Sequence, residues 1–177
     1  MFHGTYKDAV IAIEDHRFYE HFGFDFISFI RALTINLEKK ELDQGASTIT
    51  QQLAKNMYFS QEKKLVRKIA ELFVAVDLEK KYSKDQILEL YINNIYFGNG
   101  YYNIKEACNG YFSKDPIDIS KYEATYLAGI PNAPSVLSSP KYSEEARKRQ
   151  KLVLNAMVKY KKITQEEADS IFSSHNI

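Results

Sequence analysis

The sequence is poor in the features that mark several common classes of protein. Its 177 residues include a single cysteine, Cys108, so the chain can form neither an intramolecular disulfide nor a cysteine zinc site. The 24 lysine and arginine residues nearly balance the 23 aspartate and glutamate residues, and the formal net charge is +1. This charge gives no overall field for binding nucleic acid, so any binding of anions must come from local clusters of cations.

Long apolar runs are also missing. No segment approaches the roughly 20 apolar residues that a membrane-spanning helix requires. The first residues, Met1-Phe2-His3-Gly4, lack the basic stretch and the apolar stretch of a signal peptide. We therefore expect either a soluble or peripheral protein, or a domain taken from a longer, anchored protein, and the sequence leaves both alternatives open.

Helical periodicity accounts for most of the chain, and alternation with period two is never sustained. Apolar residues recur at i, i+4, i+7 and i+11 from Phe26 to Leu37 and again from Leu65 to Val76, which predicts an inner face on each helix. Capping boxes are predicted at three helix starts: Ser83 with Gln86, Ser120 with Glu123, and Thr164 with Glu167. The sequence predicts a single all-α domain over residues 1–177.

The first polar segment with candidate chemistry begins at Glu14, directly after an apolar run. A partly buried carboxylate has a tunable proton affinity, which suits a general base, whereas the alternative is a helix-end acid paired with Arg17. His21 is either a second polar group of the same site or a structural histidine, and its spacing favours the structural role. We expect the aromatic rings of Phe18 and Phe22 in the core.

The second polar segment covers residues 45–56. Ser47 is expected to cap a helix on which Thr48, Gln52 and Lys55 recur at i, i+4 and i+7 and share one face. A hydroxyl, an amide and an ammonium group beside the free N–H groups of a helix start suit a polyoxygenated anion. The alternative is an ordinary solvated face.

A third segment pairs Arg67 with Glu71 at i, i+4, which alone predicts a surface salt bridge. In the functional alternative, Arg67 lies beside Lys55 on a phosphate, which a guanidinium binds in a fork, and Glu71 faces Glu14. Carboxylates that can move protons, together with cations that can hold an anion, indicate group transfer from a phosphate-bearing substrate.

Five segments, taken in order, resemble the motifs of the peptidoglycan glycosyltransferase (transglycosylase) family, which occurs in bifunctional penicillin-binding proteins and as monofunctional enzymes. They are Glu14-Asp15 with Phe18, His21 and Gly23; Gly45 with residues 47–53, Lys55 and Asn56; Arg67-Lys68-Ile69 with Glu71; Lys84 with Ile87-Leu88-Glu89 and Tyr91-Ile92-Asn93; and Leu127 to Ser135. The chain departs from the family pattern at Asn103, which replaces a usual glycine.

The resemblance implies an all-α, lysozyme-like fold with a small hydrophobic lobe that contacts the membrane. It implies an enzyme that polymerises lipid II into β-1,4-linked glycan strands by inverting transfer, with release of the lipid diphosphate, at the outer face of the cytoplasmic membrane. An N-terminal membrane anchor and a transpeptidase domain would lie outside residues 1–177, the transpeptidase being fused or a separate partner.

The same resemblance assigns roles to individual residues. Glu14 matches the catalytic base, which would deprotonate the 4-hydroxyl of the acceptor sugar, and Glu71 matches the second acid. Thr48, Gln52, Lys55 and Arg67 match residues that hold the phosphates and sugars of the donor, and the residues expected near them are His21, Arg31, Ser47 and Asn56. No metal-ligand spacing is present, so no cofactor is required, although Mg²⁺ or Mn²⁺ could neutralise the diphosphate.

The segment from Phe22 to Ile30 has more apolar residues than one helix face can bury. Phe26 and Ile30 are expected in the core, and the side chains of Phe24, Ile27 and Phe29 are expected to contact the bilayer. Two alternatives to the transferase stay open: a lysozyme-like hydrolase or lytic transglycosylase that acts on finished glycan, and a catalytically silent scaffold that binds membranes.

Overall fold

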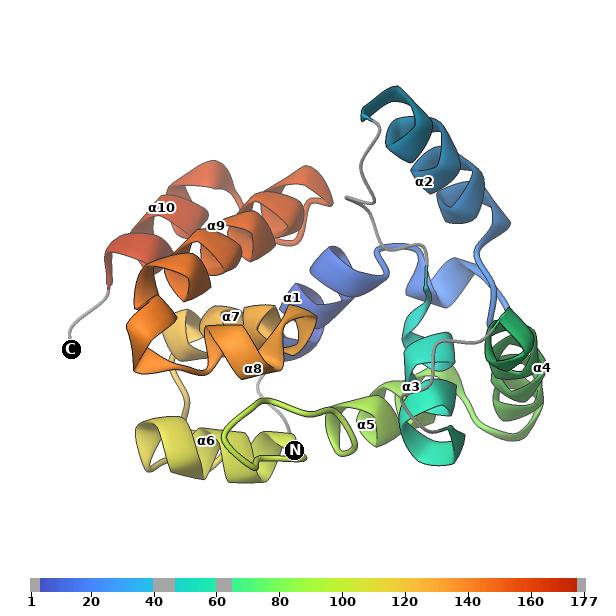
Figure 1. The fold of residues 1–177 in the computed structure, drawn as a ribbon. Coiled ribbons are helices and arrows are strands. Elements are labelled where there is room, and N and C mark those ends of the chain that lie inside the picture. The colour runs from blue at the N-terminus through green and yellow to red at the C-terminus, as the bar shows by residue number, and fades with distance from the viewer. Residues whose placement is uncertain (1–3, 40–46, 60–64, 175–177) are drawn as a thin grey trace. The chain divides into compact units, whose positions relative to one another are not determined.

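The structure, a computed structural model, describes residues 4–39, 47–59 and 65–174. Every regular element within these residues is a helix, which confirms the predicted all-α class (Figure 1). The α-helices are α1 (Gly4–Glu14), α2 (Phe26–Lys39), α3 (Ile49–Tyr58), α4 (Leu65–Lys81), α5 (Lys84–Ile92), α6 (Ile104–Phe112), α7 (Lys121–Gly129), α8 (Pro134–Leu137), α9 (Ser143–Lys159) and α10 (Gln165–Ser173). Short 3-10 helices cover Phe18–Glu20, Ile130–Asn132 and Pro140–Tyr142.

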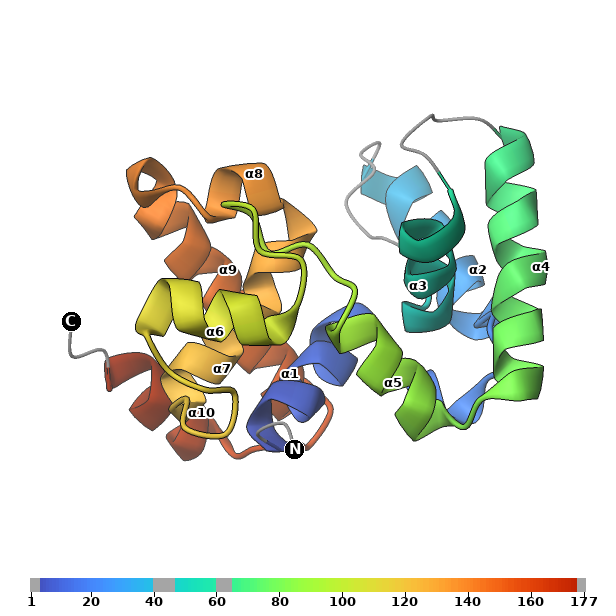
Figure 2. The same cartoon turned by 90° about the horizontal axis from the view of Figure 1, so that it is seen from below.

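The chain forms two compact units, which are described separately. Unit 1 consists of Met1–His16 and Ile92–Ile177, and unit 2 is Arg17–Tyr91. In unit 1, α1, α7 and α9 contact one another, and α10 packs on α7 and α9 (Figure 2). The core of this unit is apolar and well buried, and its members include Tyr6, Phe97, Leu127 and Val153. In unit 2, α3 and α4 run side by side.

Helix starts in both units follow local side-chain chemistry. The three predicted capping boxes form, at Ser83 with Gln86, Ser120 with Glu123, and Thr164 with Glu167. Asn103 adopts an extended backbone with φ −156°, and its side-chain oxygen accepts a hydrogen bond from the backbone N–H of Glu106. Asn103 therefore serves as the N-cap of α6, a role for which asparagine is well suited.

Unit 2 depends on a close approach between a glycine and α4. Gly23 has φ +83°, and a Cβ atom there would lie 3.1 Å from the carbonyl carbon of Ala75. The carbonyl oxygen of Gly23 accepts a 2.8 Å hydrogen bond from Thr48 Oγ1, at the start of α3. The absence of a side chain at Gly23 lets the backbone pack against α4. The same residue accepts the hydrogen bond from the N-cap of α3.

A buried ion pair also joins three helices of unit 2. Glu79, on α4, is 3% exposed and accepts hydrogen bonds from Thr50 Oγ1 on α3 at 2.6 Å and from Lys84 Nζ on α5 at 2.7 Å. The ammonium group of Lys84 also lies 4.4 Å from the centroid of the Phe18 ring, which is itself buried. Lys84 thus has a structural role.

Several predictions of burial are wrong. Phe22, Phe26 and Ile30 were expected in the core, but they are 54%, 64% and 44% exposed. Ile69 was expected on the inner face of its helix and is also exposed, because α4 turns Glu71, Ala75, Leu78 and Glu79 inward instead. The side chains of Leu33, Leu37 and Leu65 lie outside the described residues.

Within the residues that the structure describes, none of the helices is both long and apolar enough to cross a membrane.

Candidate active site

Helix α3 and its N-cap carry Thr48, Gln52 and Lys55, three of the residues predicted to bind an anion. Its N-cap is Thr48 rather than Ser47, so that prediction was wrong by one residue. Thr48 is buried, and its hydroxyl accepts from the backbone N–H of Gln51 while it donates to the carbonyl of Gly23. The shift has a physical cause, because only Thr48 is placed to form a capping box with Gln51.

The next turns of α3 hold the remaining predicted residues. Gln52 is half-buried, and its side-chain oxygen accepts a 3.1 Å hydrogen bond from the hydroxyl of Tyr91, a buried residue of α5. Lys55 is half-buried one turn further along, and Asn56 beside it is exposed. The hydroxyl of Tyr91 therefore helps to fix the amide of Gln52 on α3.

The acid on α4 lies between two cations. The Glu71 side chain is 1% exposed, with Oε1 2.9 Å from Arg67 Nε and Oε2 3.0 Å from Lys68 Nζ. The Arg67 contact is an ion pair without hydrogen-bond geometry, whereas the Lys68 contact is a hydrogen bond. Lys68 Nζ also donates to Ser47 Oγ at 2.8 Å. Because Glu71 is buried, this contact is not the surface salt bridge that the sequence predicted. The carboxylate instead holds two cations, Arg67 and Lys68, which together form the cationic cluster on α4.

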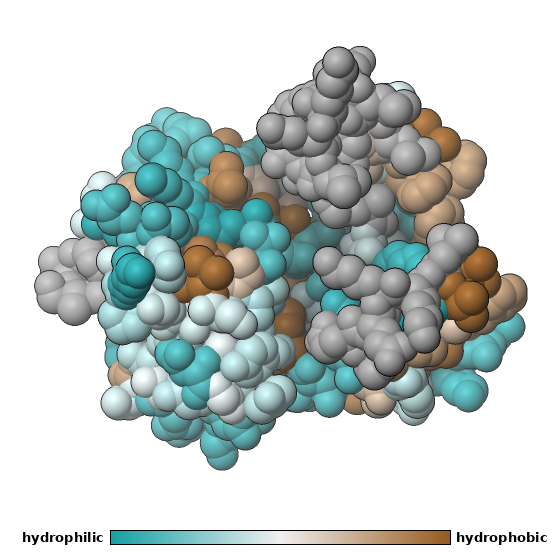
Figure 3. All heavy atoms as spheres, viewed as in Figure 1, coloured by the Kyte–Doolittle hydropathy of each residue, from teal (hydrophilic) through white to brown (hydrophobic). Residues whose placement is uncertain are grey.

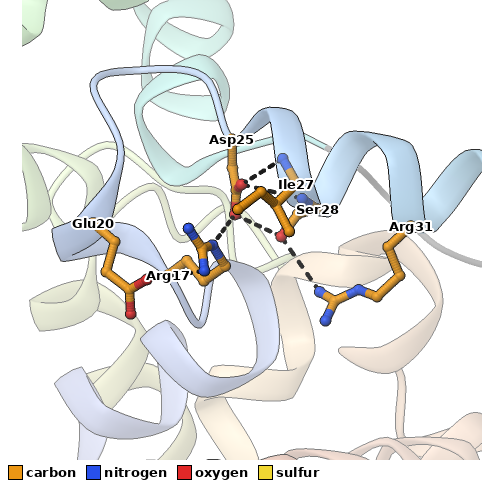
Figure 4. A network of polar contacts seen from close by, with 6 residues as sticks. All are labelled: Arg17, Glu20, Asp25, Ile27, Ser28 and Arg31. Atoms are coloured by element: carbon orange, nitrogen blue, oxygen red, sulfur yellow. Dashed lines mark hydrogen bonds and ion pairs between the residues drawn. The ribbon is translucent and has the colours of Figure 1, made fainter.

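Arg31 belongs to a polar network at the start of α2 (Figure 4). Asp25, at 3% exposure, is its centre: Oδ1 accepts from the backbone N–H groups of Ile27 and Ser28, and Oδ2 accepts from Ser28 Oγ and Arg17 Nε. Arg31 Nη2 donates to Ser28 Oγ at 3.3 Å. Although burial raises the pKa of Asp25, the hydrogen bonds from Ser28 and the charge of Arg17 lower it below its ordinary value overall.

His21 lies in the same unit as a half-buried side chain. Its ring meets the ring of Phe18 edge to face, with centroids 6.2 Å apart. Phe18 is fully buried, as the sequence predicted. His21 therefore packs on the core of unit 2.

Glu14 is the last residue of α1 in unit 1, at the end of the buried stretch that the sequence indicated. Its side chain is 16% exposed, and Oε1 lies 3.6 Å from Nη2 of Arg149, on α9. The same charge acts on the buried hydroxyl of Tyr6. Burial raises the pKa of Tyr6 strongly, and the negative charge of Glu14 contributes to the same shift. The carboxylate thus lies partly buried beside a guanidinium.

Sequence reasoning missed three residues around these groups: Lys68, Asp25 and Arg149. Arg149 had a detectable signal, because it lies one helical turn beyond Ala146 and one before Val153, both of them buried on the inner face of α9. A charged residue on such a face requires a partner, and Glu14 supplies it. For the residues covered by the structure, no group of three or more histidine, cysteine, aspartate or glutamate side chains is arranged to hold a metal ion.

Comparison with known proteins identifies the family of the chain. The family model described as "Transglycosylase" matches residues 3–158. Penicillin-binding protein 1A of Vibrio cholerae is 47% identical over 164 residues, which are 92% of this chain and 20% of that protein. Penicillin-binding protein 4 of Bacillus subtilis is 42% identical over 161 residues, which are 91% of this chain and 26% of that protein.

Among solved structures, the chain resembles penicillin-binding protein 1A from Haemophilus influenzae, with a TM-score of 0.50 and 25% sequence identity. The likeness covers 73% of this chain and 16% of that one. The helical fold and the match to the family model place the chain among the glycosyltransferases. It belongs to the transglycosylase family, whose members are peptidoglycan glycosyltransferases. The chain spans about a fifth to a quarter of the length of these curated relatives.

Proposed function

We propose that this chain polymerises lipid II into β-1,4-linked glycan by inverting transfer and releases the lipid diphosphate. The observation that carries the proposal is the cationic cluster on α4. Arg67 and Lys68 are both held on the buried carboxylate of Glu71, and Lys68 reaches the hydroxyl of Ser47 just before α3. Fixed cations of this kind stabilise the negative charge that develops on a departing diphosphate.

In this mechanism, Glu14 removes the proton from the 4-hydroxyl of the acceptor sugar. The hydroxyl oxygen forms a bond to the anomeric carbon of the donor as the bond from that carbon to the diphosphate oxygen breaks. Lys55 and Arg67 contact the diphosphate, and Thr48 and Gln52 lie on the helix face that carries Lys55. We infer that Glu71, with both oxygens engaged by cations, holds Arg67 and Lys68 in place and does not itself move a proton.

No cofactor is required by this proposal, because cations of the protein neutralise the leaving group. Mg²⁺ or Mn²⁺ bound to the diphosphate would add to the same effect. The proposed site of action is the outer face of the cytoplasmic membrane, where the lipid-linked substrate resides. A transpeptidase, fused or separate, is the proposed partner that would use the glycan product.

We also propose that α2 contacts the bilayer surface. Of the three residues predicted to do so, Ile27 is exposed, whereas Phe24 and Phe29 are half-buried, with ring centroids 5.5 Å apart. Phe26, which was assigned to the core, is 64% exposed. Figure 3 shows apolar atoms over α2 and α4. The exposed large apolar residues of segment 22–30 and of α4 are Phe22, Phe26, Ile27, Ile30, Val66, Ile69 and Phe73.

Replacing Phe26 and Ile27 by serine should weaken binding to vesicles of phosphatidylglycerol and phosphatidylethanolamine. Each side chain that leaves water contributes about 1.5 kcal/mol or more, so we expect at least a roughly tenfold loss for each. Cosedimentation with vesicles measures the effect. Leu152→Ser is the matched control, because Leu152 is also exposed but lies on α9 in the other unit. Unchanged binding of the double variant would refute the contact.

The proposed activity is tested by incubating this chain with labelled lipid II in detergent and, separately, with finished glycan. We expect polymer to form from lipid II and the finished glycan to stay intact. Cleavage of the glycan with lipid II unchanged would favour the hydrolase or lytic transglycosylase. Binding of lipid II without polymer would favour the silent scaffold.

A further inference from the structure

Arg149 projects from α9 into the bundle that α1, α7 and α9 form in unit 1. Its side chain is 19% exposed, close to the 16% of Glu14, so the two charges face each other largely away from water. Their 3.6 Å separation, between Nη2 and Oε1, is an ion-pair contact and is longer than a direct hydrogen bond.

The surroundings of Arg149 are shaped to admit its side chain. Gly129 is the last residue of α7, and a Cβ atom there would lie 3.0 Å from Arg149 Cγ. The absence of a side chain at Gly129 leaves room for the aliphatic stem of Arg149. Burial lowers the pKa of Arg149, and the charge of Glu14 opposes that shift. An arginine remains protonated under these conditions, so the charge beside Glu14 is permanent.

We propose that Arg149 is a positioning residue for Glu14, which rests on the proposed function in which Glu14 is the base. The guanidinium of Arg149 attracts Oε1 of Glu14. This attraction orients the carboxylate so that Oε2 faces the acceptor hydroxyl. In the transfer step, the acceptor O–H bond breaks and its proton goes to Glu14. The new bond to the anomeric carbon forms as the bond to the diphosphate breaks. Arg149 keeps its own protons throughout.

A merely structural ion pair is the competing explanation, and it makes a different prediction. A buried ion pair does not by itself imply a gain in stability. If the pair were only structural, its loss would change the free energy of unfolding and not kcat. A positioning role predicts a loss of kcat with substrate binding retained. Misplacing a catalytic group by about 1 Å costs on the order of a hundredfold in rate.

The test is the steady-state kinetics of lipid II polymerisation by this chain. Arg149→Met should lower kcat on the order of a hundredfold with KM nearly unchanged, and Arg149→Lys should recover part of that loss. Arg147→Met is the matched control, because Arg147 lies on the same helix over the ring of Phe172 and should behave like the parent. Millimolar guanidinium should partly restore Arg149→Ala and leave the parent unaffected.

Two further variants separate the explanations. In a Glu14→Gln background, Arg149→Met should cause no additional loss, because the residue acts through Glu14. Gly129→Ala keeps the guanidinium but displaces its stem, and it should lower kcat even if Arg149→Met fails to fold. Parent kcat in Arg149→Met, or a loss that neither lysine nor guanidinium reduces, would overturn this inference alone. A parent without polymerase activity would overturn the proposed function, and this inference with it.

Discussion

Replacing Glu14 by glutamine should lower the rate of glycan formation from lipid II on the order of a thousandfold, with little change in lipid II binding. Glutamine has nearly the same shape as glutamate, but its amide cannot accept the proton of the acceptor hydroxyl. Glu14 is held at the end of α1 by the buried stretch before it, so the substitution should leave the helix intact. Initial rates of polymer formation and direct binding of labelled lipid II measure the two effects.

Asp8→Asn provides the matched control. Asp8 also lies on α1, where it forms a 3.0 Å ion pair with Lys162, but it is 45% exposed. Loss of one carboxylate from this exposed position should leave the rate close to that of the parent. If Glu14→Gln kept the parent rate, or if both variants lost activity equally, Glu14 would not be the base.

Glu71→Gln should reduce the free energy of unfolding by about 3 kcal/mol. Both oxygens of this buried carboxylate contact cations, Arg67 at 2.9 Å and Lys68 at 3.0 Å. The substitution removes the negative charge and leaves both cations near a buried neutral amide. Denaturant unfolding followed by circular dichroism measures the change.

Asp77→Asn tests whether burial is the cause. Asp77 pairs with Lys80 at 3.3 Å on the same helix, but both side chains are more than 60% exposed. An exposed pair of this type contributes about 0.5 kcal/mol or less. Equal destabilisation by the two variants would mean that Glu71 is no more than an ordinary helix-surface acid.

Local chemistry explains what the sequence predicted well. The capping boxes at Ser120 and Thr164 depend on residues three apart, and the Arg67–Glu71 contact on residues four apart, so sequence spacing determines them. The end of α1 at Glu14 follows in the same way from an apolar run that stops.

Tertiary packing explains the errors. Phe26 and Ile30 lie on an apolar stripe, but periodicity does not say whether such a stripe faces the core or solvent, and here these two residues are exposed. The contact of Glu14 with Arg149 joins helices far apart in the chain, so no local spacing reveals it. Ser47 and Thr48 are both good N-caps, and the hydrogen bond of Thr48 to Gly23, a tertiary contact, accompanies the observed start of α3.

The roles proposed for Glu14 and for the cations of α4 both make predictions about the products of the reaction. The most direct measurement is NMR analysis of the products formed by this chain from lipid II, with quantification of the released lipid diphosphate. We expect one lipid diphosphate for each new glycosidic bond, and a β-1,4 linkage in every bond formed. Glycosidic bonds with retained configuration, or glycan cleavage without release of lipid diphosphate, would contradict it.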